Sequence, residues 1–224
     1  MHYATAERRE HLKHGLRHDP FKALVAPRPI GWISTVSASG VVNLAPYSFF
    51  NAVSDTPPMV MFSSAGRKDT LRNLEETGEF TCSMASEALV DQMNLSSAAV
   101  ASDINEYDLS GLASAPSLVV KPPRVAASPA ALECRLWKTV ELPGGPAGAG
   151  PTVVFGAVVA IYVDDRFVKD GVVDTAAIRP LARMGYMDYA VVTPETTFTL
   201  NRPQVDSDRR SARVTPGPWD GVYR

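Results

Sequence analysis

Histidine is absent from the body of this 224-residue chain. All four histidines stand within the first eighteen residues, at His2, His11, His14 and His18. Hydrolases of the Ser-His-Asp or Cys-His type need a histidine base inside the folded domain, so their mechanism is not expected here. His14 and His18 have helical spacing, but no cysteine or clear carboxylate set beside them completes a metal site. We therefore expect neither a metal centre nor a triad hydrolase.

Cysteine is scarce, and long apolar runs and runs of one charge sign are missing. Cys82 and Cys134 lie outside any C-x-x-C motif, in alternating apolar stretches that are typical of buried thiols. No apolar run approaches the roughly 20 residues of a membrane span, and the polar start lacks the apolar segment of a signal peptide. The formal net charge is −2 and no basic stripe is present. These absences predict a soluble cytoplasmic protein that binds neither membranes nor nucleic acid.

Two nucleotide-binding signatures are also missing. The loop Gly144–Gly150 is rich in glycine but lacks the Gly-Lys-Ser/Thr ending of a P-loop, and it joins two strands. We interpret it as a flexible hairpin loop. The chain has no G-x-G-x-x-G sequence, so a nicotinamide nucleotide would bind without a Rossmann unit.

Short strand patterns dominate what is present. Gly31–Val36 and Val41–Ala45 flank a turn at Gly40 and predict a β-hairpin whose second arm ends at Pro46. Further strands are expected over residues 58–63, 79–85, 130–142 and 152–163. Helices are expected to begin at three capping residues, which are Asp69 or Thr70, then Ser86, then Asp103.

The order of these elements indicates the fold class. Strands do not alternate regularly with long helices, which disfavours a doubly wound parallel sheet. A mainly β, largely antiparallel barrel with short helical insertions fits better. We expect one domain over residues 21–200, a polar leader over residues 1–20 and an extended C-terminal tail over residues 201–224.

A serine-rich loop that opens a helix is a candidate phosphate site. A helix N-terminus presents unpaired N–H groups and the positive end of the helix dipole. The loop adds hydroxyl groups and positive charges, at Ser63, Ser64, Thr70, Arg67 and Lys68. Asp69 opposes an anion at the first turn unless its side chain turns away. The alternative is an ordinary capped helix beside a solvated loop.

The aromatic bend Tyr47–Asn51 is a second candidate. Its three aromatic side chains, Tyr47, Phe49 and Phe50, stand beside Ser48 and Asn51. Such a mixture suits a flat heterocycle that polar groups orient. Alternatively, Phe49 and Phe50 are core residues at a strand bend.

Charged side chains in the second half give weaker signals. Arg179 and Arg183 are four residues apart and would contact a phosphate or an electron-rich ring edge, or else are surface arginines. The carboxylate pairs Asp164–Asp165 and Glu75–Glu76 are expected to face solvent, so no acid–base role is assigned to them.

Short motifs stand in a fixed order between residues 20 and 192. They are Arg28-Pro29-Ile30-Gly31-Trp32-Ile33-Ser34-Thr35, Asn43-Leu44-Ala45-Pro46-Tyr47-Ser48-Phe49-Phe50-Asn51, Pro57-Pro58, Lys68-Asp69-Thr70 with Asn73, Thr77-Gly78-Glu79-Phe80, Leu132-Glu133-Cys134, Gly156, Leu181-Ala182-Arg183 and Asp188-Tyr189-Ala190. In this order and spacing they resemble the flavin reductase-like family, whose fold is the FMN-binding split barrel.

The resemblance implies a six-stranded antiparallel split β-barrel with Greek-key connections. It also implies a homodimer that holds FMN, or alternatively FAD, in grooves near the subunit interface. The implied cofactor-binding residues are Ser34, Thr35, Tyr47, Ser48, Phe49, Phe50, Asn51, Ser63, Ser64, Lys68, Asp69, Thr70 and Arg183. Among them, Tyr47–Asn51 would wrap the flavin, Ser63–Thr70 would hold its phosphate, and Arg183 would approach from the second half of the chain or from the partner subunit.

The implied activity is flavin reduction by NADH or NADPH. The cofactor carries hydride transfer, which needs no protein nucleophile, so no catalytic side chain is assigned. Reduced flavin would then pass to a partner monooxygenase. Two alternatives stay open, a flavoredoxin-like electron carrier that keeps its FMN and a non-redox split-barrel protein that binds haem, pyridoxal phosphate or another small ligand.

Overall fold

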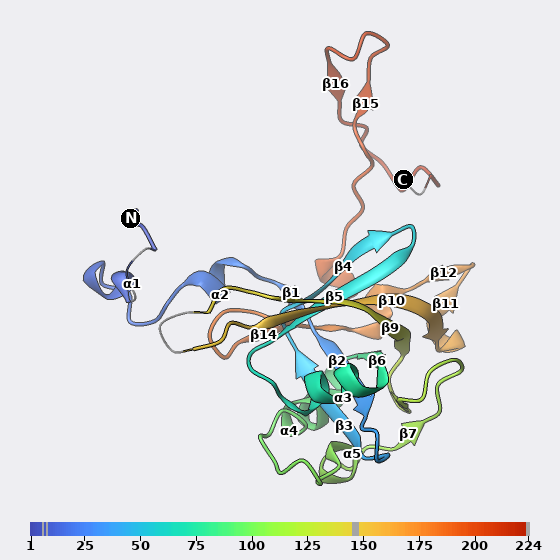
Figure 1. Ribbon diagram of the computed structural model, residues 1–224. Helices are drawn as coiled ribbons and strands as arrows, with labels where there is room; N and C mark the ends of the chain where they lie inside the picture. The colour runs from blue at the N-terminus through green and yellow to red at the C-terminus, as the bar shows by residue number, and fades with distance from the viewer. Residues whose placement is uncertain (6, 8, 145–147, 223–224) are drawn as a thin grey trace.

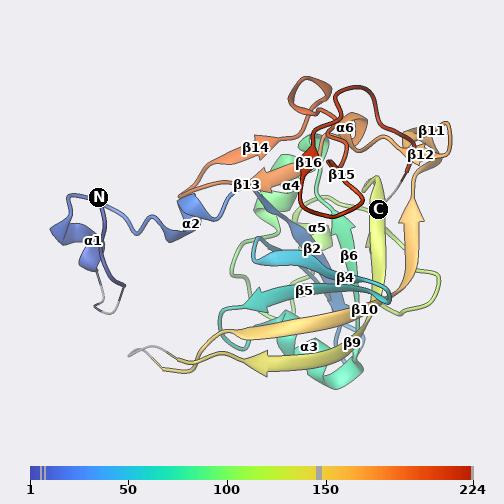
Figure 2. The same ribbon diagram turned by 90° about the horizontal axis from the view of Figure 1, so that it is seen from above.

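The computed structural model describes residues 1–5, 7, 9–144 and 148–222, and its fold is mainly β. Its main sheet has seven antiparallel strands in the order β3-β2-β6-β9-β10-β5-β4 (Figures 1 and 2). Their bounds are β2 Gly31–Val36, β3 Val42–Tyr47, β4 Phe50–Asp55, β5 Pro58–Ser64, β6 Glu79–Met84, β9 Ala130–Glu141 and β10 Thr152–Val163. The predicted antiparallel β architecture is confirmed.

The first hairpin forms where the sequence predicts it, but its second arm is longer. Gly40 takes a positive φ of 90° in the turn, which glycine adopts without a steric penalty. Pro46 does not end the arm. It lies opposite Trp32 within β3, which is possible because β3 is an edge strand of this sheet and a proline on an edge needs no outward N–H.

Strand β4 is an addition to the predicted strands. Nearly every residue of Phe50–Asp55 is exposed or only half-buried. The segment therefore lacks the apolar and polar alternation by which a half-buried strand is found in a sequence. Its pairing with β5 makes seven strands where the family resemblance implies six.

One hydrophobic core fills the inside of the curled sheet. Its largest fully buried side chains include Ile33, Phe62, Phe80 and Val154. Helix α3 (Asp69–Thr77) covers one side with Leu71 and Leu74, and it ends at Gly78, whose φ is 72°. Cys82 and Cys134 both lie in this core as free thiols. Burial raises the pKa of the Cys82 thiol to about 12.

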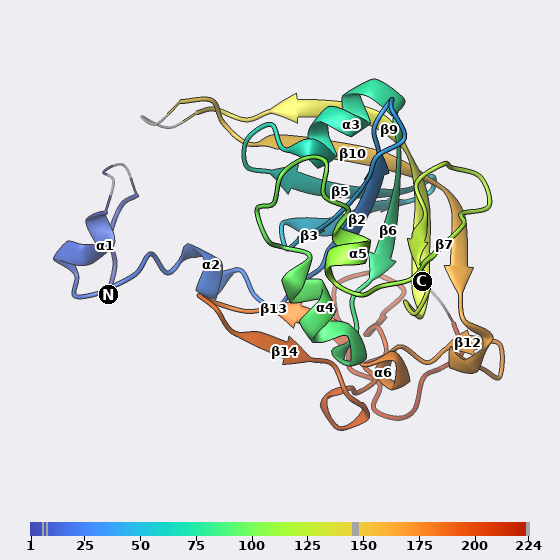
Figure 3. The same cartoon turned by 90° about the horizontal axis from the view of Figure 1, so that it is seen from below.

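A second core lies on the opposite face of β2 and β3. Trp32 and Leu44 pack there against Met93 of α4 (Val90–Leu95) and Tyr107 of α5 (Glu106–Leu109). The three helices α3, α4 and α5 gather on one side of the molecule (Figures 1 and 3). A small sheet of β1 (Arg28–Pro29), β13 (Leu181–Arg183) and β14 (Tyr189–Val191) borders this core.

The remaining elements are short. They are α1 Glu10–Lys13, α2 Phe21–Leu24, β7 Ser114–Ala115, β8 Arg124–Val125, β11 Val168–Lys169, β12 Val172–Val173, α6 Thr175–Ile178, β15 Gln204–Val205, β16 Ala212–Arg213, and the 3₁₀ turns η1 Glu87–Leu89, η2 Asp165–Phe167 and η3 Pro194–Thr196. None of the helices in the described parts of the chain is long and apolar enough to cross a membrane.

The predicted helix caps are wrong in detail. Lys68 is the residue before α3, and no side chain caps that helix. Ser86 precedes η1 without a capping hydrogen bond. Asn105, rather than Asp103, caps α5 by accepting a hydrogen bond from the backbone N–H of Tyr107 at 3.0 Å.

Both ends of the chain extend from the body (Figure 1). The leader carries α1, and the segment after η3 carries the β15–β16 hairpin, which stands away from the main sheet. The predicted Gly144–Gly150 loop lies partly outside the described residues, as do Ala6 and Arg8 of the leader and the last two residues of the tail.

Candidate functional site

The structure brings the aromatic bend and the serine-rich loop side by side. Strand β4 pairs with β5, so that Phe50 lies opposite Phe62 and Asn51 opposite Met61. The backbone N–H of Ser63 donates to the Phe49 carbonyl oxygen at 2.9 Å. The two segments predicted separately from the sequence are therefore neighbours along one pair of strands.

The N-terminus of α3 offers backbone donors that no side chain caps. The carboxylate of Asp69 lies in the first turn but pairs with the guanidinium of Arg72, which offsets its negative charge, and it caps no backbone N–H. Arg67 is held by Glu75, with its Nε 3.0 Å from that carboxylate, while Lys68 is exposed. An uncapped first turn beside an exposed lysine attracts an anion, because the first N–H groups of a helix have no intrahelical acceptor.

The Tyr47 hydroxyl is buried beside this helix end. Within the described part of the chain it has no hydrogen-bond partner. Burial raises the pKa of Tyr47, and the nearby Thr70 and Ser64 hydroxyls oppose that rise. Ser64 itself donates to the Gly66 carbonyl oxygen at 3.1 Å. A buried hydroxyl without a partner costs free energy, so Tyr47 has an unused hydrogen bond at the serine-rich loop.

Thr35 belongs to an internal polar network. Its hydroxyl oxygen accepts from the side-chain amides of Asn73 at 3.1 Å and Asn43 at 3.4 Å. Asn43 also donates to the Thr70 hydroxyl at 3.0 Å. All four residues are buried. The network fixes the first turn of α3 against β2 and β3, so Thr35 and Thr70 act in positioning that helix end.

Ser34 is not brought together with the other predicted residues. Successive side chains of a strand point to opposite faces, and Ser34 lies on the face of β2 opposite to Thr35. It lies on the side of Tyr107 of α5, whose pKa burial raises to about 12 while Ser34 opposes the rise. The two adjacent residues therefore cannot line the same groove.

Arg183 lies at the edge of the small sheet. Its guanidinium donates to the Tyr186 carbonyl oxygen at 2.7 Å and to the Tyr189 hydroxyl, and it stacks over the Tyr189 ring at 4.5 Å. It is close enough to Arg28 for its charge to add to the effect of burial in lowering the pKa of Arg28.

Arg28 connects this edge with the aromatic bend, and it is not among the site residues predicted from the sequence. Its guanidinium lies 5.9 Å from the centre of the Phe49 ring and donates to the Met184 carbonyl oxygen at 2.9 Å. Its Nε has no partner within the described residues. One sequence feature could have pointed to Arg28. It is an arginine at the start of an apolar strand, and charged residues are rarely buried unless they have a specific role.

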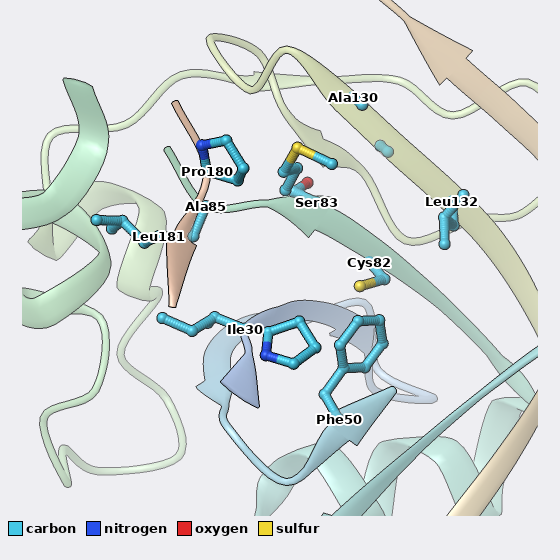
Figure 4. A pocket seen from close by; sticks show the side chains of 12 residues that line it. Ile30, Phe50, Cys82, Ser83, Ala85, Ala130, Leu132, Pro180 and Leu181 are labelled. Atoms are coloured by element: carbon cyan, nitrogen blue, oxygen red, sulfur yellow. The ribbon is translucent and has the colours of Figure 1, made fainter. Parts of the chain in front are cut away.

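Phe50 forms one wall of a small apolar pocket of about 170 Å³ (Figure 4). Phe50 and Ile30 lie on one side of it, and Ser83 and Ala130 lie on the other. Ligand sites for whole drug-sized molecules span roughly 300–1,000 Å³, whereas a cavity of about 150 Å³ admits a benzene-sized group. The pocket can hold one ring or a short apolar chain, so a larger ligand would lie along the open bend and not inside it.

Ten of the thirteen predicted residues thus fall into two neighbouring groups. Ser48, Phe49, Phe50, Asn51 and Ser63 lie along the β4–β5 pair, and Tyr47, Ser64, Lys68, Asp69 and Thr70 surround the start of α3. The other three lie apart. Ser34 lies on the opposite face of β2, Thr35 lies in the internal polar network, and Arg183 lies at the small sheet. The arrangement can bind an anionic group next to a flat ring.

The sequence and the fold are similar to those of known proteins. The model of the flavin reductase like domain matches residues 24–181. An uncharacterized protein of Aquifex aeolicus is 37% identical over 168 residues, which cover 72% of this chain and 83% of that protein. Nitrilotriacetate monooxygenase component B from Bacillus cereus superposes with a TM-score of 0.80 at 27% identity, over 89% of this chain and 98% of that one. The 2-nitrobenzoate 2-nitroreductase NbaA of Pseudomonas fluorescens gives a TM-score of 0.77 at 27% identity, over 92% and 100%.

Proposed function

The chain belongs to the flavin reductase-like family, and from this we propose that it is an FMN-binding oxidoreductase that uses NADH or NADPH to reduce flavin. One observation carries the proposal: an uncapped helix end, an exposed lysine and a buried, unpartnered tyrosine hydroxyl meet next to an aromatic bend. FMN has the same combination of a phosphate and a flat ring.

The phosphate would be held at the start of α3. The first N–H groups of the helix and the Lys68 ammonium supply positive charge, and the unpartnered Tyr47 hydroxyl supplies a further donor. Because the Asp69 carboxylate is engaged with Arg72, it does not repel an anion there. The Thr35 network keeps this helix end in place before any ligand arrives, so binding requires little reorganisation.

The ring would lie along the bend from Ser48 to Asn51. Phe49 and Phe50 give apolar contact, and the Ser48 side chain and nearby backbone groups would orient the polar ring edge, whereas the Asn51 side chain points to the other face of β4. When bound, the flavin supplies the acceptor for a hydride from the nicotinamide nucleotide. Arg28 beside Phe49 and its neighbour Arg183 place two positive charges at this edge, which would attract the phosphates of that nucleotide.

The Bacillus cereus neighbour is named as one component of a monooxygenase. That name supports a role for this chain in supplying reduced flavin to a separate oxygenase. A homodimer and a cytoplasmic location stay part of the same proposal.

Anaerobic titration tests the activity. The purified chain would be dialysed extensively, mixed with FMN and then with NADH or NADPH, while the flavin absorbance is followed. We expect FMN to bind and its absorbance to bleach on addition of one or both nucleotides, at a rate that depends on protein concentration.

Three results are distinguishable in this titration. Bleaching at the rate of a heat-unfolded control would contradict the reductase proposal. Tight FMN binding without nucleotide-dependent bleaching would identify an electron carrier instead. If FMN does not bind at all, the site is not a flavin site and the chain is a non-redox member of the fold.

A further inference from the structure

The segment that follows η3 has the sequence pattern of a strand without a sheet. Residues 197–201 read Thr-Phe-Thr-Leu-Asn, which alternates polar and apolar residues with a period of two. They are nevertheless in no strand. Phe198 and Leu200, which share one face of an extended chain, are each 78% exposed. A segment with this pattern normally packs its apolar side against another part of the protein or against a partner.

This segment belongs to a larger unit, residues 197–222, that we name the C-terminal arm. The Asn201 side chain closes the outer part of the arm on itself, since it donates to the Pro218 carbonyl oxygen at 2.8 Å and accepts from the Asp220 N–H at 3.1 Å. Large apolar side chains are exposed along the whole arm, at Phe198, Leu200, Val205, Val214, Trp219 and Val222. Exposed apolar side chains gathered on one segment are typical of an interaction surface.

A complementary surface lies on the outside of the main sheet. Met61 lies opposite Phe155, and Met59 opposite Ala157, so these side chains share the face that points away from the buried Phe62 and Val154. Trp137 of β9 is 64% exposed and contacts Phe155, with its ring 6.2 Å away at 89°. We name this surface, Met59, Met61, Phe155 and Trp137, the outer face.

We propose that the C-terminal arm of one copy of this chain packs on the outer face of a second copy, so that two copies exchange arms. The arm stands away from its own sheet (Figure 1) and would have to fold back to reach its own outer face. Reciprocal exchange covers both arms and both faces in one closed two-fold assembly. An aromatic side chain alone buries roughly 150–250 Å², so two arms supply on the order of 1,000 Å², which is the scale of a stable interface.

Sedimentation or light scattering over a concentration series tests the arm. Deleting residues 197–224, or substituting Phe198→Ser together with Leu200→Ser in the full chain, should raise the dimer dissociation constant on the order of 100-fold or more. Trp137→Ser should weaken the same dimer from the other side. Because both changes affect one contact, their combined effect should be smaller than the product of the single effects.

Leu118→Ser is the matched control, since Leu118 is 87% exposed on a loop of the body. It should leave the dissociation constant unchanged. Circular dichroism of each variant checks that the barrel is folded. If the dimer is equally stable without the arm, or if the wild-type chain is a monomer throughout, the arm exchange does not occur.

Cross-linking shows where the arm lies. Lys138 pairs with Phe155 across the strands and is exposed, so it marks the outer face. The two native cysteines are buried and will not compete. One copy with Leu200→Cys and a differently tagged copy with Lys138→Cys should join through a disulfide. The control is a mixture of the Leu200→Cys copy with a Leu118→Cys copy. The proposal would be overturned if the first mixture gave no more disulfide than this control. It would also be overturned if a disulfide formed only within a single chain that carries both Leu200→Cys and Lys138→Cys.

Discussion

At the scale of single residues, the buried Tyr47 hydroxyl is expected to affect the stability of the free protein and its affinity for ligand in opposite directions. It has no partner among the described residues of the free protein, and in the proposed complex it donates to the phosphate. A hydroxyl that is buried without a hydrogen bond destabilises the free protein, whereas the same hydroxyl stabilises the complex.

Tyr47→Phe should therefore change stability and affinity in opposite directions. The free protein should gain about 1 kcal/mol in unfolding free energy, measured by denaturant titration. FMN affinity should fall about tenfold while riboflavin affinity changes little, because riboflavin has no phosphate. Tyr189→Phe, which changes a tyrosine at the small sheet, is the control. Equal losses for FMN and riboflavin would remove Tyr47 from the phosphate site.

The residue scale is also where the sequence was least informative. That Ser34 and Thr35 face opposite sides of β2 follows from strand periodicity alone. By contrast, Asn43 and Asn73 are thirty residues apart, and only the folded chain shows that both bind the Thr35 hydroxyl. Arg28 likewise meets Phe49 and Arg183 through the folding of distant segments.

At the scale of elements, two glycines hold strands close to aromatic side chains. A Cβ on Gly31 of β2 would stand 2.5 Å from Cδ2 of Phe50, and a Cβ on Gly156 of β10 would stand 2.3 Å from Cζ of Phe80. Contacts this short force a side chain to move. Phe80 is fully buried in the core, whereas Phe50 is half-buried and borders the proposed ring site.

Alanine at these glycines should therefore have different consequences. Gly156→Ala should lower the unfolding free energy by about 1–3 kcal/mol, because Phe80 has no free space to enter. Gly31→Ala should displace Phe50 toward the bend, and lower the affinity for FMN and riboflavin alike with a smaller loss of stability. Denaturant titration and flavin binding by fluorescence measure the two quantities. If Gly31→Ala leaves both flavin affinities unchanged, Phe50 does not contact the ring.

Most elements with clear alternation or a clear turn were predictable. The first hairpin, β5, β6, β9, β10 and the C-terminal end of α3 lie within a few residues of their expected positions. Strand β4 was missed because it is exposed on most of its length. The start of α3 was predicted correctly in place but not in chemistry, since Asp69 pairs with Arg72 instead of capping the helix.

At the scale of the whole molecule, the arm and the proposed flavin site are adjacent. Asn51, at the ring end of the site, lies opposite Met61 of the outer face. An arm from a second copy would therefore cover the bend that holds the ring. If both proposals hold, dimerisation and flavin binding are linked. The dimer binds flavin more tightly than the monomer, and bound flavin therefore favours the dimer.

This linkage predicts that flavin affinity depends on protein concentration. Below the dimer dissociation constant the wild-type chain should bind FMN several-fold more weakly than above it. The chain without residues 197–224 should bind FMN with the weaker affinity at every concentration. Fluorescence titrations over a dilution series measure this, with Leu118→Ser as the control that follows the wild type. An FMN affinity that is the same at all concentrations and in both chains would contradict the linkage.

The sequence could indicate the family and the tail, but not what the tail does. The alternation in residues 197–201 indicates an extended segment with one apolar side. Which surface that side packs on cannot be predicted from the sequence, because only the structure shows that the outer face of the main sheet is not covered by another element. The side chains of the arm are exposed because the segment lies beyond β14, the last strand that pairs with the body.

The burial of both cysteines determines which sulfur atoms of this protein are open to oxidation. Oxidants attack the thiolate, and burial raises the pKa of both thiols so that little thiolate exists at neutral pH. Oxidative damage would then begin at sulfur that is open to solvent. Met187, which is 77% exposed and accepts a contact from Arg183 at 3.4 Å, is such an atom. Its sulfoxide would be polar, and a lesion at Met187 would fall beside Arg183 while the buried thiols of the barrel stayed reduced.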